Sequence, residues 1–314
     1  MALRIVFCGT PAFAVPSLQH LLTEPDFEVV GVVTQPDRPR GRGQEVHSSP
    51  VKGAAIAAGI SVYQPEKIKA DEAYEYFKRL APDAVVIIAY GQIISPRLIA
   101  IPRLGWINLH ASLLPKYRGA APINWAIVNA EARTGLTTML IDAGLDTGPM
   151  LLKYETEIGP DETAPELTVR LADAGAPLTA KTLRGLAAGE IKPVPQENSE
   201  ATFAPVLRKN DGLIEWELSA RIIYNKIRGL QPWPGAFTVF RGKNCQIWGK
   251  PLQPISAGGM PGIMLPTQED GLLVICGGNT VLRVECVQLE GRKRVTDREF
   301  MNGARIVPGE RFGA

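Results

Sequence analysis

Four apolar runs in the first third of the chain constrain its fold more than any other feature. They read LRIVFCGT (3–10), FEVVGVVTQ (27–35), DAVVIIAYG (83–91) and GWINLHA (105–111). Apolar residues occupy both alternating positions of each run, which indicates strands that are buried on both faces. Segments with helical patterns, such as DEAYEYFKRL, lie between the runs. This order predicts a mostly parallel, doubly wound sheet covered by helices on both faces, in the α/β class.

Ligands bind to such sheets outside the carboxyl ends of the strands, so the residues that follow each strand are the first candidates for a site. These are Gly9 and Thr10, the segment 89–92, and the segment 108–115. The first turn, CGTPAFAVP, contains neither the G-x-G-x-x-G pattern of dinucleotide sites nor the phosphate-loop pattern of ATP sites. Proline near a helix start is enough to explain this turn.

The second half of the chain has a different character. Residues 161–188 predict a helix that is broken near Pro177, and residues 189–205 are polar and proline-rich, as in a linker. Beyond them, one short helix (SARIIYNKIRGL) and several short strands with glycine turns indicate a small antiparallel barrel or sandwich. We therefore predict a domain over 1–188, a linker over 189–205 and a second domain over 206–314.

Composition narrows the classes of protein that fit. A chain of 314 residues that is 45% hydrophobic and 21% charged suits two globular domains, and it has no apolar run of membrane-spanning length. Four cysteines without C-x-x-C spacing predict buried reduced thiols rather than a metal site, and hence a cytoplasmic protein. Residues 206–314 carry a net charge of +5, which fits a polyanionic partner and equally a solvated surface.

Asn108 and His110 are polar residues in a run that otherwise resembles a core strand. Residues two apart in a strand project from the same face, so the two side chains point the same way. An amide and an imidazole at the end of a strand suit the stabilisation of an oxyanion on a carbonyl that becomes tetrahedral. The alternative is a pair of polar side chains whose hydrogen bonds go to loop backbone.

A second candidate is the glycine-containing loop of MLIDAGLDTGPML (139–151), which carries Asp142 and Asp146. A carboxylate from this loop could orient His110 and accept a proton from an attacking amine. A plain turn is the alternative interpretation of an isolated D-x-G motif.

Taken together, HASLLPKYRGAAPINWAI (110–127), the preceding Asn108 and DAGLDTGPM (142–150) resemble the formyltetrahydrofolate-dependent formyltransferase family. The resemblance extends over nearly the whole chain. The linker, the C-terminal strands and RGLQPWPGAF (228–237) are most similar to the members that act on methionyl-tRNA. The fold that it implies is an N-terminal Rossmann-like, doubly wound, mostly parallel sheet followed by a small OB-like β-barrel that binds tRNA.

The resemblance also implies roles for individual residues. Asn108 and His110 would polarise the formyl oxygen, and Asp146 would position the histidine and help to deprotonate the amine. 10-Formyltetrahydrofolate would be the co-substrate, with no metal. Its expected contacts are Ile88, Ala89, Tyr90, Gly91, Gln92, Ser112, Leu113, Leu114, Pro115 and Asp142.

The segment TQPDRPRGRGQEVHSSPVK (34–52) alternates arginine with proline and glycine, which predicts a mobile, extended, cationic loop. In the tRNA-directed members an insertion at this place enters the acceptor arm of the initiator tRNA. The resemblance therefore implies tRNA contacts from Arg38, Arg40, Arg42, Arg208 and Lys209. GRKR (291–294) is either a further RNA contact or a solvated turn.

The expected activity is thus formylation of the α-amino group of methionyl initiator tRNA in bacterial-type translation initiation, by a cytoplasmic monomer without a membrane partner. Relatives that share this chemistry formylate a purine ribonucleotide or an amino-sugar nucleotide, or hydrolyse the donor. The purine enzyme lacks a second domain, which argues against that activity here. The sugar-nucleotide enzyme shares a barrel extension, so only the arginine loop and the basic C-terminal domain distinguish the present chain from it. A tRNA-binding module without catalysis is the alternative from another class.

Overall fold

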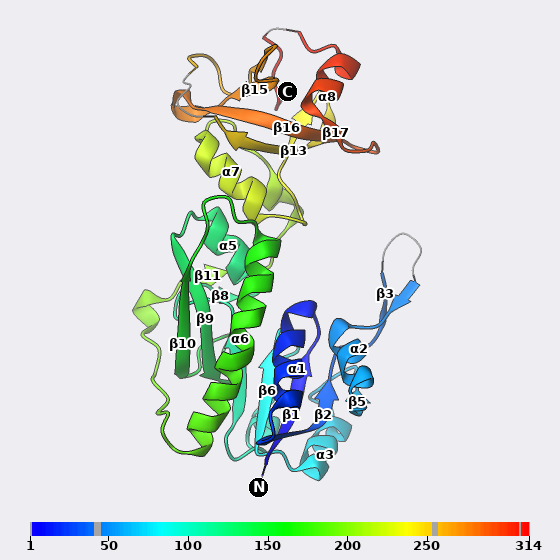
Figure 1. The fold of residues 1–314 in the computed structure, drawn as a ribbon, viewed down its shortest axis with the longest axis vertical. Coiled ribbons are helices and arrows are strands. Elements are labelled where there is room, and N and C mark those ends of the chain that lie inside the picture. Colours follow the sequence, from blue (N-terminus) through cyan, green and yellow to red (C-terminus); the bar gives the residue numbers. More distant parts are fainter. Residues whose placement is uncertain (1, 41–44, 253–256, 308, 314) are drawn as a thin grey trace. The chain divides into compact units, whose positions relative to one another are not determined.

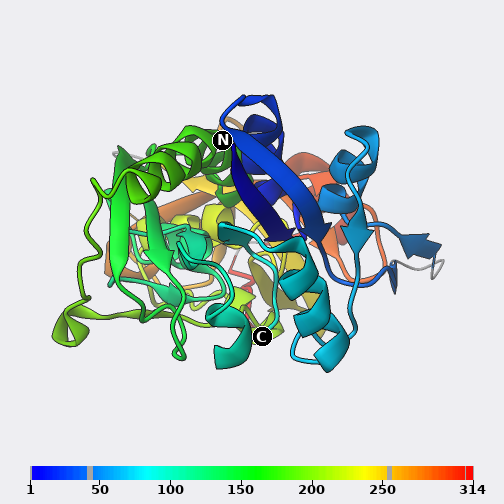
Figure 2. The same ribbon diagram turned by 90° about the horizontal axis from the view of Figure 1, so that it is seen from below.

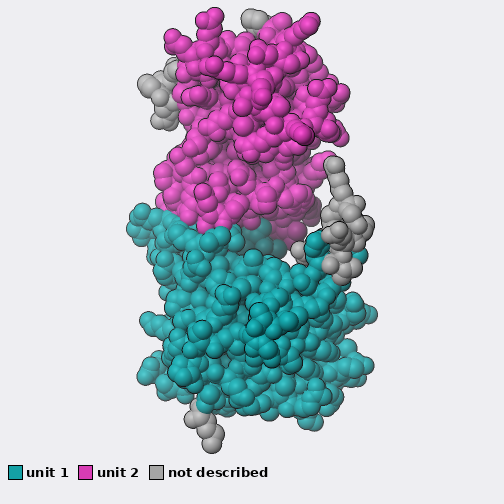
Figure 3. All heavy atoms as spheres, turned by 45° about the vertical axis from the view of Figure 1, so that its right-hand side comes forward, with its two compact units in different colours: residues 1–122, 133–157, 167–204 teal, residues 123–132, 158–166, 205–314 magenta. Residues whose placement is uncertain are grey.

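The structure, a computed structural model, describes residues 2–40, 45–252, 257–307 and 309–313. These residues form two compact units (Figures 1 and 3). Unit 1 comprises residues 1–122, 133–157 and 167–204, and unit 2 comprises residues 123–132, 158–166 and 205–314. Each unit has its own sheet and its own hydrophobic core.

Unit 1 is built on a seven-stranded sheet with the strand order β10-β9-β7-β6-β1-β2-β5. Its strands are β1 (Leu3–Gly9), β2 (Phe27–Val33), β5 (Val62–Tyr63), β6 (Ala84–Ile88), β7 (Trp106–His110), β9 (Arg133–Leu140) and β10 (Met150–Glu157). The five strands from β5 to β7 are parallel, and β9 runs antiparallel to both β7 and β10. β1 and β6 are neighbours although two strands of this sheet, β2 and β5, separate them in sequence, so the winding changes direction between them.

Helices cover both faces of this sheet (Figures 1 and 2). They are α1 (Val15–Thr23), α2 (Pro50–Ala57), α3 (Asp71–Leu80), α4 (Pro96–Ile99) and α6 (Ala164–Ala187), whereas α5 (Pro122–Val128) belongs almost wholly to unit 2. Phe77 of α3 and Leu98 of α4 pack with Trp106 on one face, whereas Gly175 of α6 lies against Leu109 on the other. Neighbouring residues of β7 therefore face opposite helix layers, which the alternation of strand side chains requires.

One sequence prediction about this unit is wrong. The helix of residues 161–188 is not broken at Pro177, because α6 continues without interruption from Ala164 to Ala187. Leu171 before the proline and Leu183 after it are both fully buried. The apolar face thus stays packed across the proline, and burial offsets the one backbone hydrogen bond that proline cannot make.

Unit 2 contains a six-stranded antiparallel sheet in the order β12-β13-β16-β15-β14, with β17 paired to β16. The elements are α7 (Ala220–Gly229), β12 (Phe237–Phe240), β13 (Lys243–Pro251), β14 (Met264–Pro266), β15 (Leu272–Ile275), β16 (Val281–Leu289), β17 (Val295–Thr296) and α8 (Asp297–Ala304). α7 packs on β13. The sequence patterns did not indicate α8.

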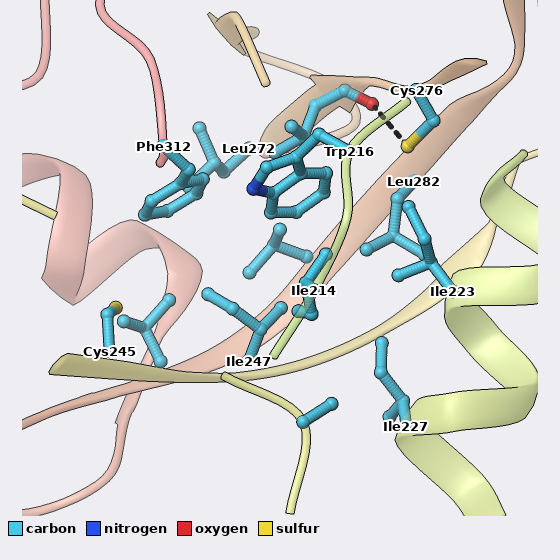
Figure 4. Packing of buried hydrophobic residues seen from close by; sticks show 14 of the residues in the cluster. Ile214, Trp216, Ile223, Ile227, Cys245, Ile247, Leu272, Cys276, Leu282 and Phe312 are labelled. Carbon is cyan, nitrogen blue, oxygen red and sulfur yellow. Dashed lines mark hydrogen bonds between the residues drawn. The ribbon is translucent and has the colours of Figure 1, made fainter. Parts of the chain in front are cut away.

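The core of unit 2 lies between this sheet and its helices (Figure 4). Trp216 stacks on Phe312, with ring centroids 5.7 Å apart, and its indole N–H donates to the Thr238 hydroxyl at 3.0 Å. Cys245, Ile247 and Val287 point into the same core. One face of β13 and β16 is therefore fully used for packing, and the other face is turned away from this core.

Two pairs of short strands complete the description of the backbone. β3 (Arg38–Arg40) and β4 (Glu45–His47) form an antiparallel hairpin, and β8 (Arg118–Gly119) pairs with β11 (Phe203–Ala204). The predicted extended arginine loop therefore has strand structure in its described part. The predicted fold class, an α/β domain with a mostly parallel sheet and a C-terminal antiparallel β domain, is confirmed. The boundaries at 188 and 205 stay a prediction.

The contact between α6 and β7 can be tested by adding one methyl group. A Cβ at position 175 would lie 2.5 Å from Leu109 Cδ2, a buried atom next to His110. We expect Gly175→Ala to lower the free energy of unfolding by about 1–2 kcal/mol, since overpacking costs more than the gain in helix propensity.

Gly53 of α2 is the matched control, because no atom lies within 4 Å of a Cβ built there. Gly53→Ala should raise the free energy of unfolding by about 0.5–1 kcal/mol. Urea unfolding midpoints of the two variants decide the matter, and shifts of the same sign would contradict the packing argument.

Candidate active site

Asn108, His110 and Asp146 meet at the carboxyl end of β7. Asn108 and His110 lie in the strand, and Asp146 lies in the loop that connects β9 to β10. The Asn108 amide donates to Asp146 Oδ1 at 3.5 Å, and His110 Nδ1 lies 3.6 Å from Asp146 Oδ2. The structure thus brings together the three residues that the sequence predicted to be catalytic, on one side of the strand.

The imidazole of His110 is buried, with 6% of the residue exposed, and both of its nitrogens face polar atoms. Nε2 lies 2.9 Å from the carbonyl oxygen of Tyr117, which can only accept a hydrogen bond, so Nε2 carries a hydrogen. Nδ1 faces the Asp146 carboxylate, which also only accepts. A hydrogen on Nδ1 would therefore point at the Asp146 carboxylate, so the geometry lets this carboxylate orient the imidazole ring.

A backbone N–H also binds the carboxylate oxygen of Asp146 that faces His110. The amide of Gly119 donates to Oδ2 at 2.8 Å. Asp146 itself has a positive φ of 53°, a conformation that aspartate tolerates better than most residues. The side chain therefore leaves its loop in an unusual direction, towards β7, and three donors orient it.

The rest of this loop is held from within. Asp142 Oδ1 accepts from the Gly144 amide at 3.0 Å and from the Thr147 hydroxyl at 2.7 Å. A Cβ at Gly148 would lie 1.8 Å from the Leu140 carbonyl oxygen, so only glycine fits there. Asp142 was predicted to contact folate. The structure gives one of its oxygens a role in closing the loop, and the folate contact stays a prediction.

Gln196 and Arg118 hold the backbone of the Asp146 loop in place. No sequence pattern predicted a role for either residue. The Gln196 amide donates to the carbonyl oxygens of Asp146 and Gly148, each at 2.8 Å. Its oxygen accepts from Arg118 Nε at 3.0 Å and from an NH2 group of the same guanidinium at 2.8 Å. Arg118 is buried and also donates to Asn198. Gln196 belongs to a segment whose composition predicted a linker, which offered no signal for such a role.

The Ser112–Pro115 turn is a buried part of the site. Ser112 donates to the Lys116 carbonyl at 2.6 Å, and its own carbonyl accepts from Thr137 at 2.7 Å. The Leu114 carbonyl accepts from Lys153 Nζ at 2.6 Å. Of the four predicted folate contacts in this turn, Leu113 is partly exposed and the other three are buried.

The predicted folate segment after β6 makes a sharp turn. Ala89 and Gly91 both have positive φ angles, 47° and 87°, and both are exposed. Ile88 and Tyr90 are buried in the core, and burial raises the pKa of the Tyr90 phenol. Gln92 is engaged within the protein, since its oxygen accepts from the Ile68 amide at 2.7 Å. Within the segment 88–92, the backbone atoms of Ala89 and Gly91 are therefore the groups that a ligand can reach.

A cavity of about 790 Å³ lies at the same edge of the sheet. Thr10, Gln35, Gly91 and Gln92 line it, together with Arg38 and Lys67. The hairpin that supplies Arg38 is anchored at its base, where Asp37 pairs with Lys52 and accepts from Gln64 at 2.9 Å. The hydrogen bond from Lys52, followed by that from Gln64, lowers the pKa of Asp37.

The remaining predicted tRNA contacts lie in three places. Arg42 lies outside the described residues, and Arg40 is in β3. Arg208 and Lys209 are exposed in unit 2. The structure therefore places Arg38 at the cavity described above, but it does not bring the five predicted residues into one described cluster.

Among the residues that the structure describes, no group of three or more His, Cys, Asp or Glu side chains is placed to hold a metal ion. In the same residues, no helix is both long enough and apolar enough to cross a membrane. The four cysteines are free, and burial raises the pKa of Cys245 and Cys276 to about 12, which keeps these thiols protonated.

Comparison with known proteins agrees with this arrangement. Residues 3–183 match the family described as formyl transferase, and residues 206–305 match the formyl transferase C-terminal domain. The chain belongs to the formyl transferase family. A methionyl-tRNA formyltransferase of Solibacter usitatus is 52% identical over 311 residues, which are 99% of each chain. That of Koribacter versatilis is 51% identical, over 98% of each chain.

A solved structure also shares the fold of this formyl transferase. It is a sugar 3N-formyl transferase, WlaRD, crystallised in the presence of dTDP and 5-N-formyl-THF. Its TM-score is 0.65 at 20% sequence identity, and the match covers 93% of the present chain and 100% of WlaRD. At this level of identity the comparison concerns the fold alone.

The first prediction for the site concerns His110. We expect His110→Ala to lower the formyl-transfer turnover by about 100-fold or more, since the variant loses both a donor and a positive charge beside the formyl oxygen. His20→Ala is the control, because His20 lies on α1 and pairs with Glu24. Single-turnover kinetics would measure the chemical step. A rate for His110→Ala within a few-fold of the parent would remove His110 from the chemistry.

A second prediction separates the two roles of Gln196. Gln196→Leu removes both hydrogen bonds to the loop carbonyls and the one oxygen that accepts two hydrogen bonds from buried Arg118. It should therefore lower stability by about 1–3 kcal/mol and lower turnover as well. Gln196→Glu keeps the acceptor for Arg118 but loses the donors to Asp146 and Gly148. If Gln196 positions Asp146, this variant should keep most of its stability and still lose turnover, by roughly tenfold.

Full turnover in Gln196→Glu would show that the support of the loop carbonyls has no catalytic effect. Thermal melts and kcat, measured on the same preparations, distinguish the two outcomes.

Proposed function

We propose that the protein transfers the formyl group of 10-formyltetrahydrofolate to the α-amino group of methionine on initiator tRNA. The observation that carries the proposal is its 52% identity, over 99% of both chains, to a methionyl-tRNA formyltransferase. The convergence of Asn108, His110 and Asp146 supplies the chemistry that such a transfer needs. A tRNA-binding module without catalysis would have no reason to keep a buried histidine, an amide and a carboxylate in this geometry.

In the proposed reaction, the neutral α-amine attacks the formyl carbon and a new C–N bond forms. The formyl oxygen becomes an oxyanion, which the Asn108 amide and the protonated His110 stabilise. The amine nitrogen then loses a proton to Asp146, directly or through water. As the bond from the formyl carbon to N10 breaks, N10 takes up a proton, so the products are formylmethionyl-tRNA and tetrahydrofolate.

The folate donor is proposed to lie along the carboxyl edge of β6 and β7. The exposed backbone of Ala89 and Gly91 can bond to the pterin ring, which resembles the edge of a base. Leu113 offers the partly exposed side chain of the Ser112–Pro115 turn. The structure of a protein with the same fold, determined in the presence of 5-N-formyl-THF, is consistent with this assignment.

The tRNA is proposed to contact the hairpin of β3 and β4 and the start of unit 2. Arg38 is exposed and Arg40 follows it in strand β3, whereas Arg42 lies outside the described residues. Such a basic arm can contact phosphates of an acceptor stem. Arg208 and Lys209 are exposed and would add contacts from unit 2. We also propose a cytoplasmic, monomeric enzyme, as expected from the sequence.

An acceptor screen tests this function. With 10-formyltetrahydrofolate as donor, initiator methionyl-tRNA should be formylated with a kcat/KM at least 100-fold above those of elongator methionyl-tRNA and UDP-amino sugars. Its KM should rise with salt, because phosphate contacts release counterions. Formylation of a UDP-amino sugar in preference to tRNA would reassign the substrate, and donor hydrolysis alone would reject an acceptor altogether.

A further inference from the structure

The outer face of the sheet in unit 2 carries a small pocket that the proposed chemistry does not use. Its volume is about 280 Å³, and Lys209, Trp233, Phe237, Asn244, Gln246 and Gln288 are among the residues that line it. All of them belong to unit 2. The pocket combines an aromatic side chain, several amides and a cation on one surface.

Strand register places three of these residues in one row. Phe237 of β12 is paired with Gln246 of β13, and Gln246 is paired with Gln288 of β16. Directly paired residues of antiparallel strands point to the same side of the sheet. Their neighbours Cys245 and Ile247 point into the core, so the row of Phe237, Gln246 and Gln288 faces outward.

Trp233 stands at the end of this row and is 55% exposed. Pro234 beside it is buried, and its carbonyl accepts from the Gln246 amide at 3.3 Å, so the loop that carries the indole is fixed to the row. Exposure of a single apolar residue is common and by itself means little. Here the exposed ring is held against a polar pocket, which provides a flat surface for stacking.

Gln246 and Gln288 both offer a side-chain amide oxygen to the pocket. Gln246 Nε2 donates to the Pro234 carbonyl, and Gln288 Nε2 donates to the Arg292 carbonyl at 2.9 Å. Within the described part of the chain, neither side-chain oxygen has a partner. Both amides are thus anchored through nitrogen and offer oxygen acceptors to a ligand. Acceptors suit a ligand with amino groups, such as the exocyclic amines of adenine and cytosine.

Positive charge surrounds the pocket. Lys209 lines it, and the exposed residues Arg292, Lys293 and Arg294 form the turn that follows β16. The Arg294 guanidinium lies over the Trp248 ring, 4.1 Å from its centroid, in the next row of the same face. Glu290 is the acidic residue in the lining. Cations around an aromatic surface are the usual means of binding single-stranded nucleic acid.

We propose that this face binds an unpaired adenine or cytosine nucleotide of the tRNA, an inference that rests on the proposed function. Trp233 stacks on the base, and the oxygens of Gln246 and Gln288 accept from its amino group. Lys209 and the turn at 292–294 contact the phosphates. The 3′ end of tRNA is unpaired and consists of cytosines and an adenine, so it offers nucleotides of this type.

Anisotropy titrations of short labelled RNAs with the full-length protein test the site directly. The probes are single-stranded A/C-rich and U-rich hexamers and a duplex of the same length. Trp233→Ala should lower affinity for the A/C-rich hexamer about tenfold or more, and Trp233→Phe should restore most of it because a ring remains. Ile222→Ala, which alters another exposed apolar residue of unit 2, should bind like the parent. Gln288→Met should reduce the preference for A/C-rich over U-rich RNA.

Formylation assays on the same variants provide the second readout. Trp233→Ala should raise the KM for methionyl-tRNA and leave the KM for 10-formyltetrahydrofolate at the parent value, which a general loss of folding would not do. Parent-like hexamer binding by Trp233→Ala, or equal affinity of the parent for duplex and single strand, would overturn the inference. If the parent formylates no tRNA, the proposed function fails, and the hexamer titrations still decide whether this face binds nucleotides.

Discussion

The position of the Asp146 carboxylate is the constraint on which the site depends. This group lies within 3.6 Å of both Asn108 and His110, and it also accepts the backbone N–H of Gly119. Removing it would leave the Asn108 amide and His110 Nδ1 without the acceptor that both of them face. Under the proposed function, Asp146 therefore has two roles, since it orients His110 and is available to accept a proton from the amine.

The Asp146 carboxylate is held in place by residues of its own loop and by residues far away in sequence. The loop of Asp146 is closed by Asp142 and Thr147, and the Gln196 amide binds its carbonyls from outside. The same segment supplies β11, which pairs with β8 next to Gly119. Residues 194–204 thus hold the backbone on two sides of the Asp146 carboxylate, at its own loop and at Gly119. A change in this segment can alter catalysis without touching a substrate, because it acts through the direction in which Asp146 leaves its backbone.

Much of this could be predicted from sequence, for a physical reason. Both the sheet and the location of the site follow from apolar periodicity and from the rule that ligands bind at the carboxyl ends of parallel strands. The two-residue spacing of Asn108 and His110 required that they share a face. The family resemblance added Asp146, which local pattern alone could not separate from an ordinary turn.

Gln196 and Arg118 could not be predicted, because a hydrogen bond across 78 residues leaves no periodic signal. The continuity of α6 through Pro177 also depended on tertiary burial, which outweighs local propensity.

The surroundings of His110 also determine the path that its protons can take. Nε2 is committed to the Tyr117 carbonyl, a group that cannot take up a proton at neutral pH, so that nitrogen holds its hydrogen throughout. Only Nδ1 faces a group that can exchange a proton, and that group is Asp146. The histidine therefore does not relay protons from one side of the ring to the other. Under the proposed function, it offers one hydrogen on Nδ1 beside the formyl oxygen, and proton removal from the amine is left to the carboxylate or to water. Strand β7 places the histidine, and the β9–β10 loop places the carboxylate.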